Sequence, residues 1–108
     1  MPNHAELILC TCPDRDTSEK IAKRLVEGRL AACVNILPGL TSVYTWQDRL
    51  ETAGEHLLLI KSTRDCYPLI ERTIRDLHPY DLPEIIALPV ARGLPDYLNW
   101  IDACVSTN

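Results

Sequence analysis

Apolar residues recur along this chain in two different periods, and the alternation of these periods predicts the order of its structural elements. Residues 6–12 form a short apolar run that a Pro-Asp pair ends, which is typical of a buried strand. A helical pattern follows, because apolar residues at 21, 22, 25 and 26 share one face. We expect Asp16 to cap this helix together with Glu19, and Gly28 to end it in a left-handed conformation.

A long hairpin is predicted in the middle of the chain. Residues 30–37 are apolar, a Pro-Gly pair interrupts them, and β-branched and aromatic residues resume at 42–46, so we expect one strand with a bulge. A turn at 47–49 leads into a return strand through 55–61. Strands usually run about 3 to 10 residues, so this hairpin outgrows its sheet. We expect Tyr44 and Trp46, near its tip, to pack on another copy of the protein; the alternative is the hairpin's own partner strand.

The second half of the chain adds a helix, a strand and a terminal helix. Asp65 begins a predicted helix that ends before a His-Pro pair, and residues 84–90 and 96–104 read as a strand and a short helix. The order βαββαβ predicts an α+β fold of the ferredoxin-like type in a single domain, residues 1–108. Two helices cover only one face of such a sheet. We therefore expect the bare apolar face to be covered by further copies in a cyclic homo-oligomer.

Composition and charge exclude several classes of protein. With 108 residues, 24% of them charged and 46% hydrophobic, the chain is expected to fold as an ordinary globular domain. The net charge of −4 and the lack of a Lys/Arg cluster argue against nucleic acid as a partner. Neither an apolar run of about 18 residues nor a signal peptide is present, so we expect a cytoplasmic protein with no membrane partner.

The five cysteines are odd in number and scattered, which does not indicate a disulfide framework. Most are expected to be small buried hydrophobic residues. Only Cys10 and Cys12 have a spacing that favours chemistry, because residues i and i+2 of a strand share one face.

The connection at 78–84 concentrates polar groups between a predicted helix and a predicted strand. It reads His-Pro-Tyr-Asp-Leu-Pro-Glu, and its two prolines restrict both their own φ angles and the residues before them. This stiff loop is a candidate functional site. A proline-bounded turn that merely stops a helix is the structural alternative.

Six segments together resemble one known family, the CutA divalent-ion tolerance proteins, and the resemblance extends from Leu9 to Trp100. The segments occur in the family's order, and are residues 10–14, 30–39, 42–46, 59–63, 78–85 and 97–101. Asp48 stands where many members have glycine at the hairpin tip, and we expect the turn to survive because aspartate tolerates a left-handed conformation. Leu77 stands where some bacterial members have a second histidine, and leucine cannot coordinate a metal.

The resemblance implies a compact homotrimer whose hairpins reach across neighbouring subunits. It also implies association with divalent metal ions, copper in particular, and a role in metal tolerance. It implies no established enzymatic reaction. Animal members are linked to the anchoring of a membrane esterase, and the trimer is similar to that of the PII signalling proteins.

The first functional hypothesis is a metal site formed by Cys10, His78 and Glu84. Thiolate and imidazole suit copper or zinc, and a carboxylate shifts the preference toward harder ions. The ends of the first and fourth strands can converge in this fold, which would bring these side chains together. The structural alternative is that Cys10 is a core thiol and that His78 forms hydrogen bonds at a helix end.

Two other hypotheses remain open. A signalling or adaptor trimer could bind a small anionic ligand or a protein at subunit clefts, with a lining of Lys61, Arg64, Tyr80 and Glu84. A cysteine-dependent enzyme would use Cys10 or Cys12 with His78 as the base, oriented by Asp81 or Glu84, but an apolar strand is a poor setting for a reactive thiol.

Overall fold

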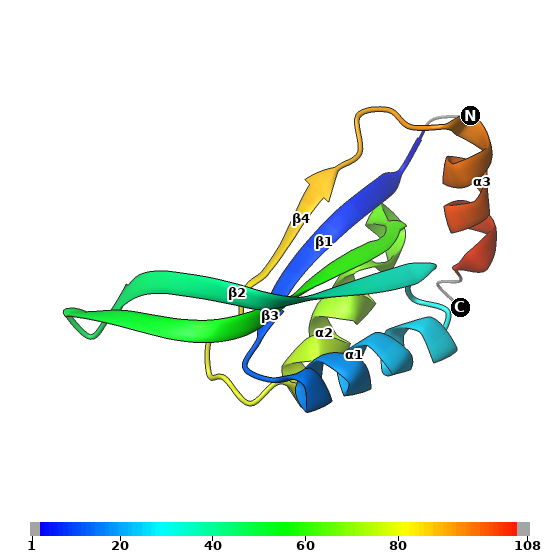
Figure 1. Ribbon diagram of the computed structural model, residues 1–108. Coiled ribbons are helices and arrows are strands. Elements are labelled where there is room, and N and C mark those ends of the chain that lie inside the picture. Colours follow the sequence, from blue (N-terminus) through cyan, green and yellow to red (C-terminus); the bar gives the residue numbers. More distant parts are fainter. Residues whose placement is uncertain (1–2, 106–108) are drawn as a thin grey trace.

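The computed structural model describes residues 3–105, which form a four-stranded antiparallel sheet and its helices (Figure 1). The strand order is β2-β3-β1-β4, so the ferredoxin-like α+β prediction is confirmed. The elements, in chain order, are β1 (Ala5–Cys12), α1 (Arg15–Glu27), β2 (Cys33–Trp46), β3 (Arg49–Thr63), the 3-10 turn η1 (Arg64–Cys66), α2 (Tyr67–Leu77), β4 (Ile85–Pro89) and α3 (Pro95–Cys104).

The core lies between the sheet and the two helices α1 and α2, which cover the same face of it (Figure 1). Alternate residues of the central strands point into this layer, because side chains of a strand alternate between the two faces. Fully buried side chains come from the sheet and from both helices, and include Ile8, Leu58, Ile60, Ile21, Leu25, Ile70 and Ile74. The core is therefore a single layer between the sheet and α1 and α2.

The opposite face of the sheet carries a row of apolar residues that neither α1 nor α2 covers. Leu59, Leu9 and Ile86 are in register across three adjacent strands, and Ile86 is 50% exposed. Helix α3 reaches this side at one end, where the ammonium of Lys61 lies 5.9 Å from the ring centre of Tyr97. The single chain thus leaves this face of the sheet bare, as predicted.

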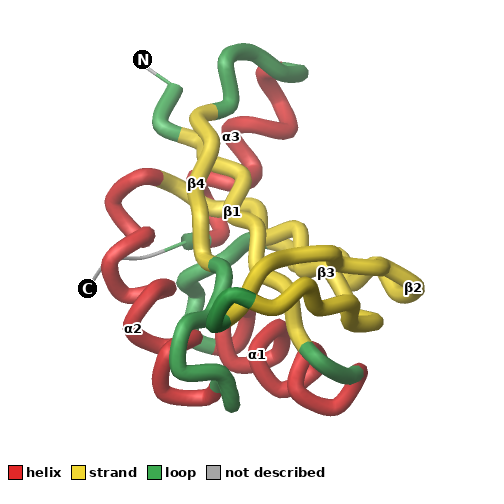
Figure 2. Tube along the Cα trace, turned by 90° about the vertical axis from the view of Figure 1, so that its left-hand side faces the viewer, coloured by secondary structure: helices red, strands yellow, loops and turns green. Residues whose placement is uncertain are grey.

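The β2–β3 hairpin extends well beyond the body of the protein, as both views show (Figures 1 and 2). It gives the molecule dimensions of 47 × 25 × 22 Å. The register shifts between Leu37 and Leu40, where Gly39 has a φ of 79°, so the predicted bulge is present. At the tip Gln47 and Asp48 have φ angles of 52° and 64°, which confirms that aspartate sustains the left-handed turn.

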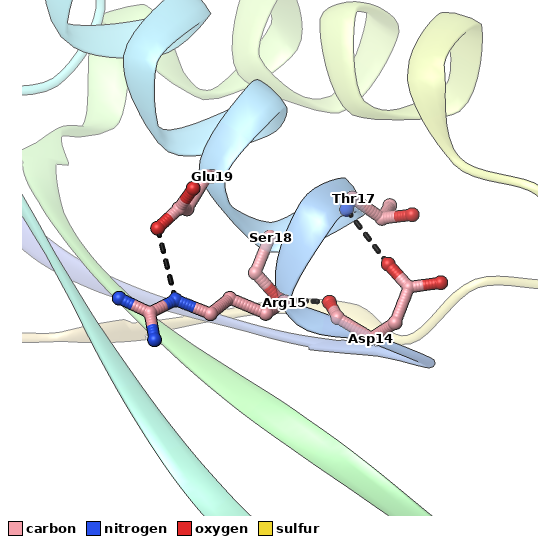
Figure 3. A network of polar contacts seen from close by, with 5 residues as sticks. All are labelled: Asp14, Arg15, Thr17, Ser18 and Glu19. Carbon is pink, nitrogen blue, oxygen red and sulfur yellow. Dashed lines mark hydrogen bonds and ion pairs between the residues drawn. The ribbon is translucent and has the colours of Figure 1, made fainter.

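The start of α1 differs from the prediction. Asp14, not Asp16, is the N-cap: its Oδ1 accepts a hydrogen bond of 2.8 Å from the backbone N–H of Thr17 (Figure 3). Asp16 lies in the first turn, where its charge favours the helix dipole. The preceding apolar strand ends at Cys12, so the helix begins two residues earlier than the pattern of apolar residues indicates.

The ends of the helices also depart from the prediction in two places. Gly28 has a φ of −80°, and the left-handed residue after α1 is instead Arg29, with a φ of 58°. Helix α2 begins at Tyr67, because residues 64–66 form the separate turn η1. It ends at Leu77, where the proline after His78 favours the extended conformation that His78 adopts (φ −83°, ψ 135°). None of the helices within residues 3–105 has the length and apolar character needed to cross a membrane.

Candidate metal site and the cavity beside it

Strand β1 brings the thiols of Cys10 and Cys12 to the same side of the sheet. Both residues are fully buried in the layer under the helices, as expected for residues i and i+2 of a strand whose neighbour Ile8 also points inward. The backbone register places Cys10 opposite Leu58 and Ile85 on the two neighbouring strands. Cys10 is therefore held by paired strands on both sides, whereas Cys12 pairs only with His56 of β3.

His78 turns its imidazole toward β1 from the end of α2. Its Nε2 lies 2.8 Å from the carbonyl oxygen of Thr11, and its Nδ1 accepts a hydrogen bond of 3.2 Å from the backbone N–H of Tyr80. Because an N–H can only donate and a carbonyl can only accept, these partners fix the neutral tautomer with the proton on Nε2. The residue is only 7% exposed. Pro79 favours the extended backbone of His78, which directs its buried ring toward β1.

Cys10, Cys12 and His78 together form a thiol–imidazole site. One ligand atom from each of the three residues lies within 4.8 Å of the others. Within residues 3–105, this is the one group of three or more His, Cys, Asp or Glu side chains close enough to share a metal ion. Cys12 was absent from the predicted ligand set, although the Cys-x-Cys spacing on one strand face was the signal that could have included it.

The two thiols influence each other's ionisation. The hydrogen bond with Cys12 and then burial raise the pKa of the Cys10 thiol well above its usual range, and the charge of Glu84 adds to the rise. The pKa of the Cys12 thiol is lowered, because a hydrogen bond from Cys10 stabilises its thiolate against the opposing effect of burial. Of the two thiols, Cys12 therefore loses its proton more readily than Cys10.

Glu84 does not join this site. Cys10 faces the helices opposite Ile85, and a residue one position before Ile85 points toward the other face of the sheet. Glu84 is exposed and instead lines a cavity of about 770 Å³. The structure thus groups Cys10 and His78 with Cys12, and it does not bring Glu84 of the predicted set to them.

The cavity lies between the outer part of β2 and the connection that follows His78. Its lining includes Tyr44, Trp46 and Tyr80, as well as Thr11, whose carbonyl holds His78. The hydroxyl of Tyr80 donates a hydrogen bond of 3.0 Å to Oε2 of Glu55, a buried carboxylate of β3. Burial, followed by this hydrogen bond to Glu55, raises the pKa of Tyr80 to about 12.

A family model described as "CutA1 divalent ion tolerance protein" matches residues 6–104 of the chain. The chain belongs to the CutA family. The divalent-cation tolerance protein CutA of Thermus thermophilus is 50% identical over 96 residues, which cover 89% of this chain and 93% of that protein. Protein CutA of Mus musculus is 41% identical over 101 residues; they cover 94% of this chain, and the chain spans only 57% of the mouse protein. The crystal structure of CutA from Xylella fastidiosa has 46% identity and a TM-score of 0.93, and covers 95% of this chain and 99% of that one.

The two basic residues predicted for an anion-binding cleft lie away from this cavity. Lys61 lies at the opposite end of β3, over Tyr97, and Arg64 follows the end of that strand. Neither residue lines the cavity with Tyr80 and Glu84 in the single chain. The predicted cleft lies between subunits, and it stays a prediction. The residues that do line the cavity bring carboxylates and aromatic rings.

A cysteine-dependent reaction finds little support in the same geometry. The nitrogens of His78 are held by backbone groups of Thr11 and Tyr80, and the predicted orienting carboxylate of Asp81 lies in the lining of the cavity. A nucleophilic thiol must be accessible, whereas Cys10 and Cys12 are completely buried. The CutA family name describes ion tolerance and names no reaction.

Proposed function

We propose that this CutA protein is a homotrimer that binds copper at the thiol–imidazole site and contributes to metal tolerance without catalysing a reaction. The observation that carries the proposal is the convergence of two thiols and one imidazole within 4.8 Å. Donor atoms of a tetrahedral metal stand about 3.5 Å apart when the ligand bonds are about 2.0 to 2.3 Å long, so small side-chain rotations are sufficient.

The donor set favours copper over harder ions. Thiolate sulfur selects Cu(I) and zinc, and imidazole suits copper and zinc as well. Cys10, Cys12 and His78 supply no oxygen ligand, which disfavours magnesium, calcium and manganese. Binding requires the thiols to lose their protons and His78 to release one of its two hydrogen bonds, and the positive charge of the metal offsets the thiolate charge.

Competition titration of Cu(I) against a chromogenic chelator tests the site. We expect one copper per chain in the wild type and a loss of affinity of at least about 10-fold in Cys10→Ser, Cys12→Ser and His78→Gln. Cys33→Ser is the matched control, because it removes a half-buried thiol outside the site. Unchanged affinity in all three site variants would refute the site. Tighter binding of zinc than of copper would refute only the identity of the metal.

The bare face and the hairpin support the trimer. Large apolar side chains are exposed on both, and among them are Ile86 (50%), Leu50 (77%) and Val43 (64%). An apolar surface of this extent on one subunit marks a protein contact. We expect light scattering to give three times the chain mass of 12.2 kDa, and Ile86→Asp to reduce it. Val26→Asp, at an exposed position on α1, is the control. A wild-type mass of one chain would exclude the trimer.

We further propose the cytoplasm as the compartment. All five cysteines are free in the structure, and a reducing compartment keeps buried thiols available for a soft metal. Cell fractionation of the tagged native protein tests the location, and recovery outside the cytoplasmic fraction would contradict it.

A further inference from the structure

Strand β3 places His56 directly beside the thiol–imidazole site. Cys12 and His56 are register partners of the antiparallel β1–β3 pair. Leu58 and Ile60 are fully buried under the helices, so His56, two positions before Leu58, points to the same face of the sheet. The imidazole of His56 and the thiol of Cys12 are therefore cross-strand neighbours on the face that carries the thiol–imidazole site.

One nitrogen of His56 is buried and has no partner. The residue is half-buried, and its Nδ1 is one of two buried side-chain polar atoms within residues 3–105 that make no hydrogen bond. Such atoms are rare in folded proteins, because burial removes their hydrogen bonds to water. Since Nδ1 is already buried within one chain, a side chain of a second copy does not reach it. With the ring proton on Nε2, Nδ1 offers the lone pair that a metal ion accepts.

The thiol–imidazole site supplies only three ligands, whereas a tetrahedral ion takes four. Water is a poor fourth ligand, because Cys10 and Cys12 are fully buried and His78 is only 7% exposed. His56 stands outside the group whose ligand atoms lie within 4.8 Å of one another, so it joins by rotation of its side chain. Directly opposite residues of an antiparallel pair have their Cβ atoms about 4.5 to 5.5 Å apart. From that spacing a thiol and an imidazole can reach the separation of about 3.5 Å between donor atoms around a tetrahedral ion.

We propose that His56 is a fourth ligand of this site and that the completed site binds Zn(II). The inference rests on the proposed thiol–imidazole site and adds one residue and a second metal to it. Two thiolates and two neutral imidazoles form a donor set that tetrahedral zinc favours. The two thiol protons leave to the solvent, and the thiolates then balance the charge of Zn(II), so the complex has no net charge and suits a buried position. Cu(I) leaves an excess negative charge and accepts three ligands, so its binding depends less on His56.

Competition titration of Zn(II) against a chromogenic chelator, in parallel with Cu(I), tests this inference on the full-length protein in its native assembly. We expect one zinc per chain in the wild type. His56→Gln should lower the zinc affinity at least about 10-fold and the Cu(I) affinity by less than about 3-fold. His4→Gln is the matched control, because His4 is exposed and precedes the opposite end of β1, where Ala5 pairs with Thr63. It should bind both metals like the wild type.

Imidazole resonances give a second readout on the wild type, which does not depend on the folding of a variant. The chain has three histidines, so the signals of each ring can be assigned by their loss in one variant. Zn(II) is diamagnetic, because its d shell is full. It should shift the ring resonances of His56 and His78 and leave those of His4 unchanged.

The failure of this inference is distinguishable from the failure of the copper site. Equal zinc affinity in His56→Gln and His4→Gln, ring resonances of His56 that zinc does not move, or no zinc binding to the wild type would each overturn the role of His56. The copper site still stands after any of these results when Cys10→Ser, Cys12→Ser and His78→Gln lower the affinity for Cu(I). Unchanged Cu(I) affinity in those three variants refutes the copper site itself.

Discussion

Replacing His78 by alanine should destabilise the protein even when no metal is present. The side chain is 7% exposed and makes two hydrogen bonds, to the Thr11 carbonyl at 2.8 Å and from the Tyr80 N–H at 3.2 Å. Thr11 is itself 7% exposed, so its carbonyl loses a partner that water cannot replace. An unsatisfied buried group costs about 1 to 3 kcal/mol, and lost ring packing adds to this. We expect the free energy of unfolding to fall by about 2 to 4 kcal/mol.

Urea unfolding in EDTA, followed by circular dichroism at one fixed chain concentration, measures this loss. His56→Ala is the matched control: His56 is half-buried, and its buried Nδ1 has no hydrogen-bond partner among the described residues. It should cost less than about 1 kcal/mol. His78→Gln should regain part of the stability, because an amide can both donate and accept, while still losing copper. Equal costs for the two alanine variants would refute the structural role of His78.

Three further predictions concern the fold around the site. The carboxylate of Asp14 caps α1, and the hydrogen bonds from Thr17 lower its pKa. Its contribution to stability is therefore present above the pKa of the unfolded chain and is lost as the pH falls through the pKa of the folded protein. Unfolding of Asp14→Ala, measured as a function of pH, should lack this loss of stability in acid. Gly39→Ala should destabilise the hairpin by about 1 kcal/mol because of its φ of 79°, whereas Gly54→Ala, with free space around it, should be neutral by thermal unfolding. Ultraviolet titration should show two phenols with a pKa of about 12, those of Tyr67 and Tyr80, and only one of them in Tyr80→Phe. Because the pKa of Tyr80 is raised in the folded state, the associated stability is present below about pH 10 and is lost as pH rises.

The order of the helices and strands could be predicted from the sequence because the period of the apolar residues agrees with the positions of the turn-forming residues along most of the chain. The same patterns do not fix single-residue positions. Asp14 and Asp16 are both acceptable caps, and the choice depends on where β1 ends. Gly28 and Arg29 differ by one residue, yet only Arg29 is left-handed, because Gly28 prolongs the last turn by a hydrogen bond to Arg24. Local preference alone cannot separate such neighbours.

In the candidate site, too, the sequence did not predict in which direction each side chain points. Cys10 and His78 were predicted because chemistry and strand adjacency both pointed to them. Glu84 lies apart from them because it precedes β4, whose register with β1, Cys10 opposite Ile85, is set by tertiary pairing. The acidic character of the cavity could not be read from the sequence, since Glu55 and Tyr80 meet only when the connection folds against β3.

The position of β1 in the sheet has a consequence for biosynthesis. β1 is made first but lies between β3 and β4, so its two edges are not both paired until residue 89 has been synthesised. At about 5 to 20 residues per second, the ribosome needs several seconds to pass from Cys12 to His78. During that interval the thiols of Cys10 and Cys12 are exposed on an unpaired strand. Each new chain therefore depends on a reducing environment, or on a metal-free one, before the sheet closes over them.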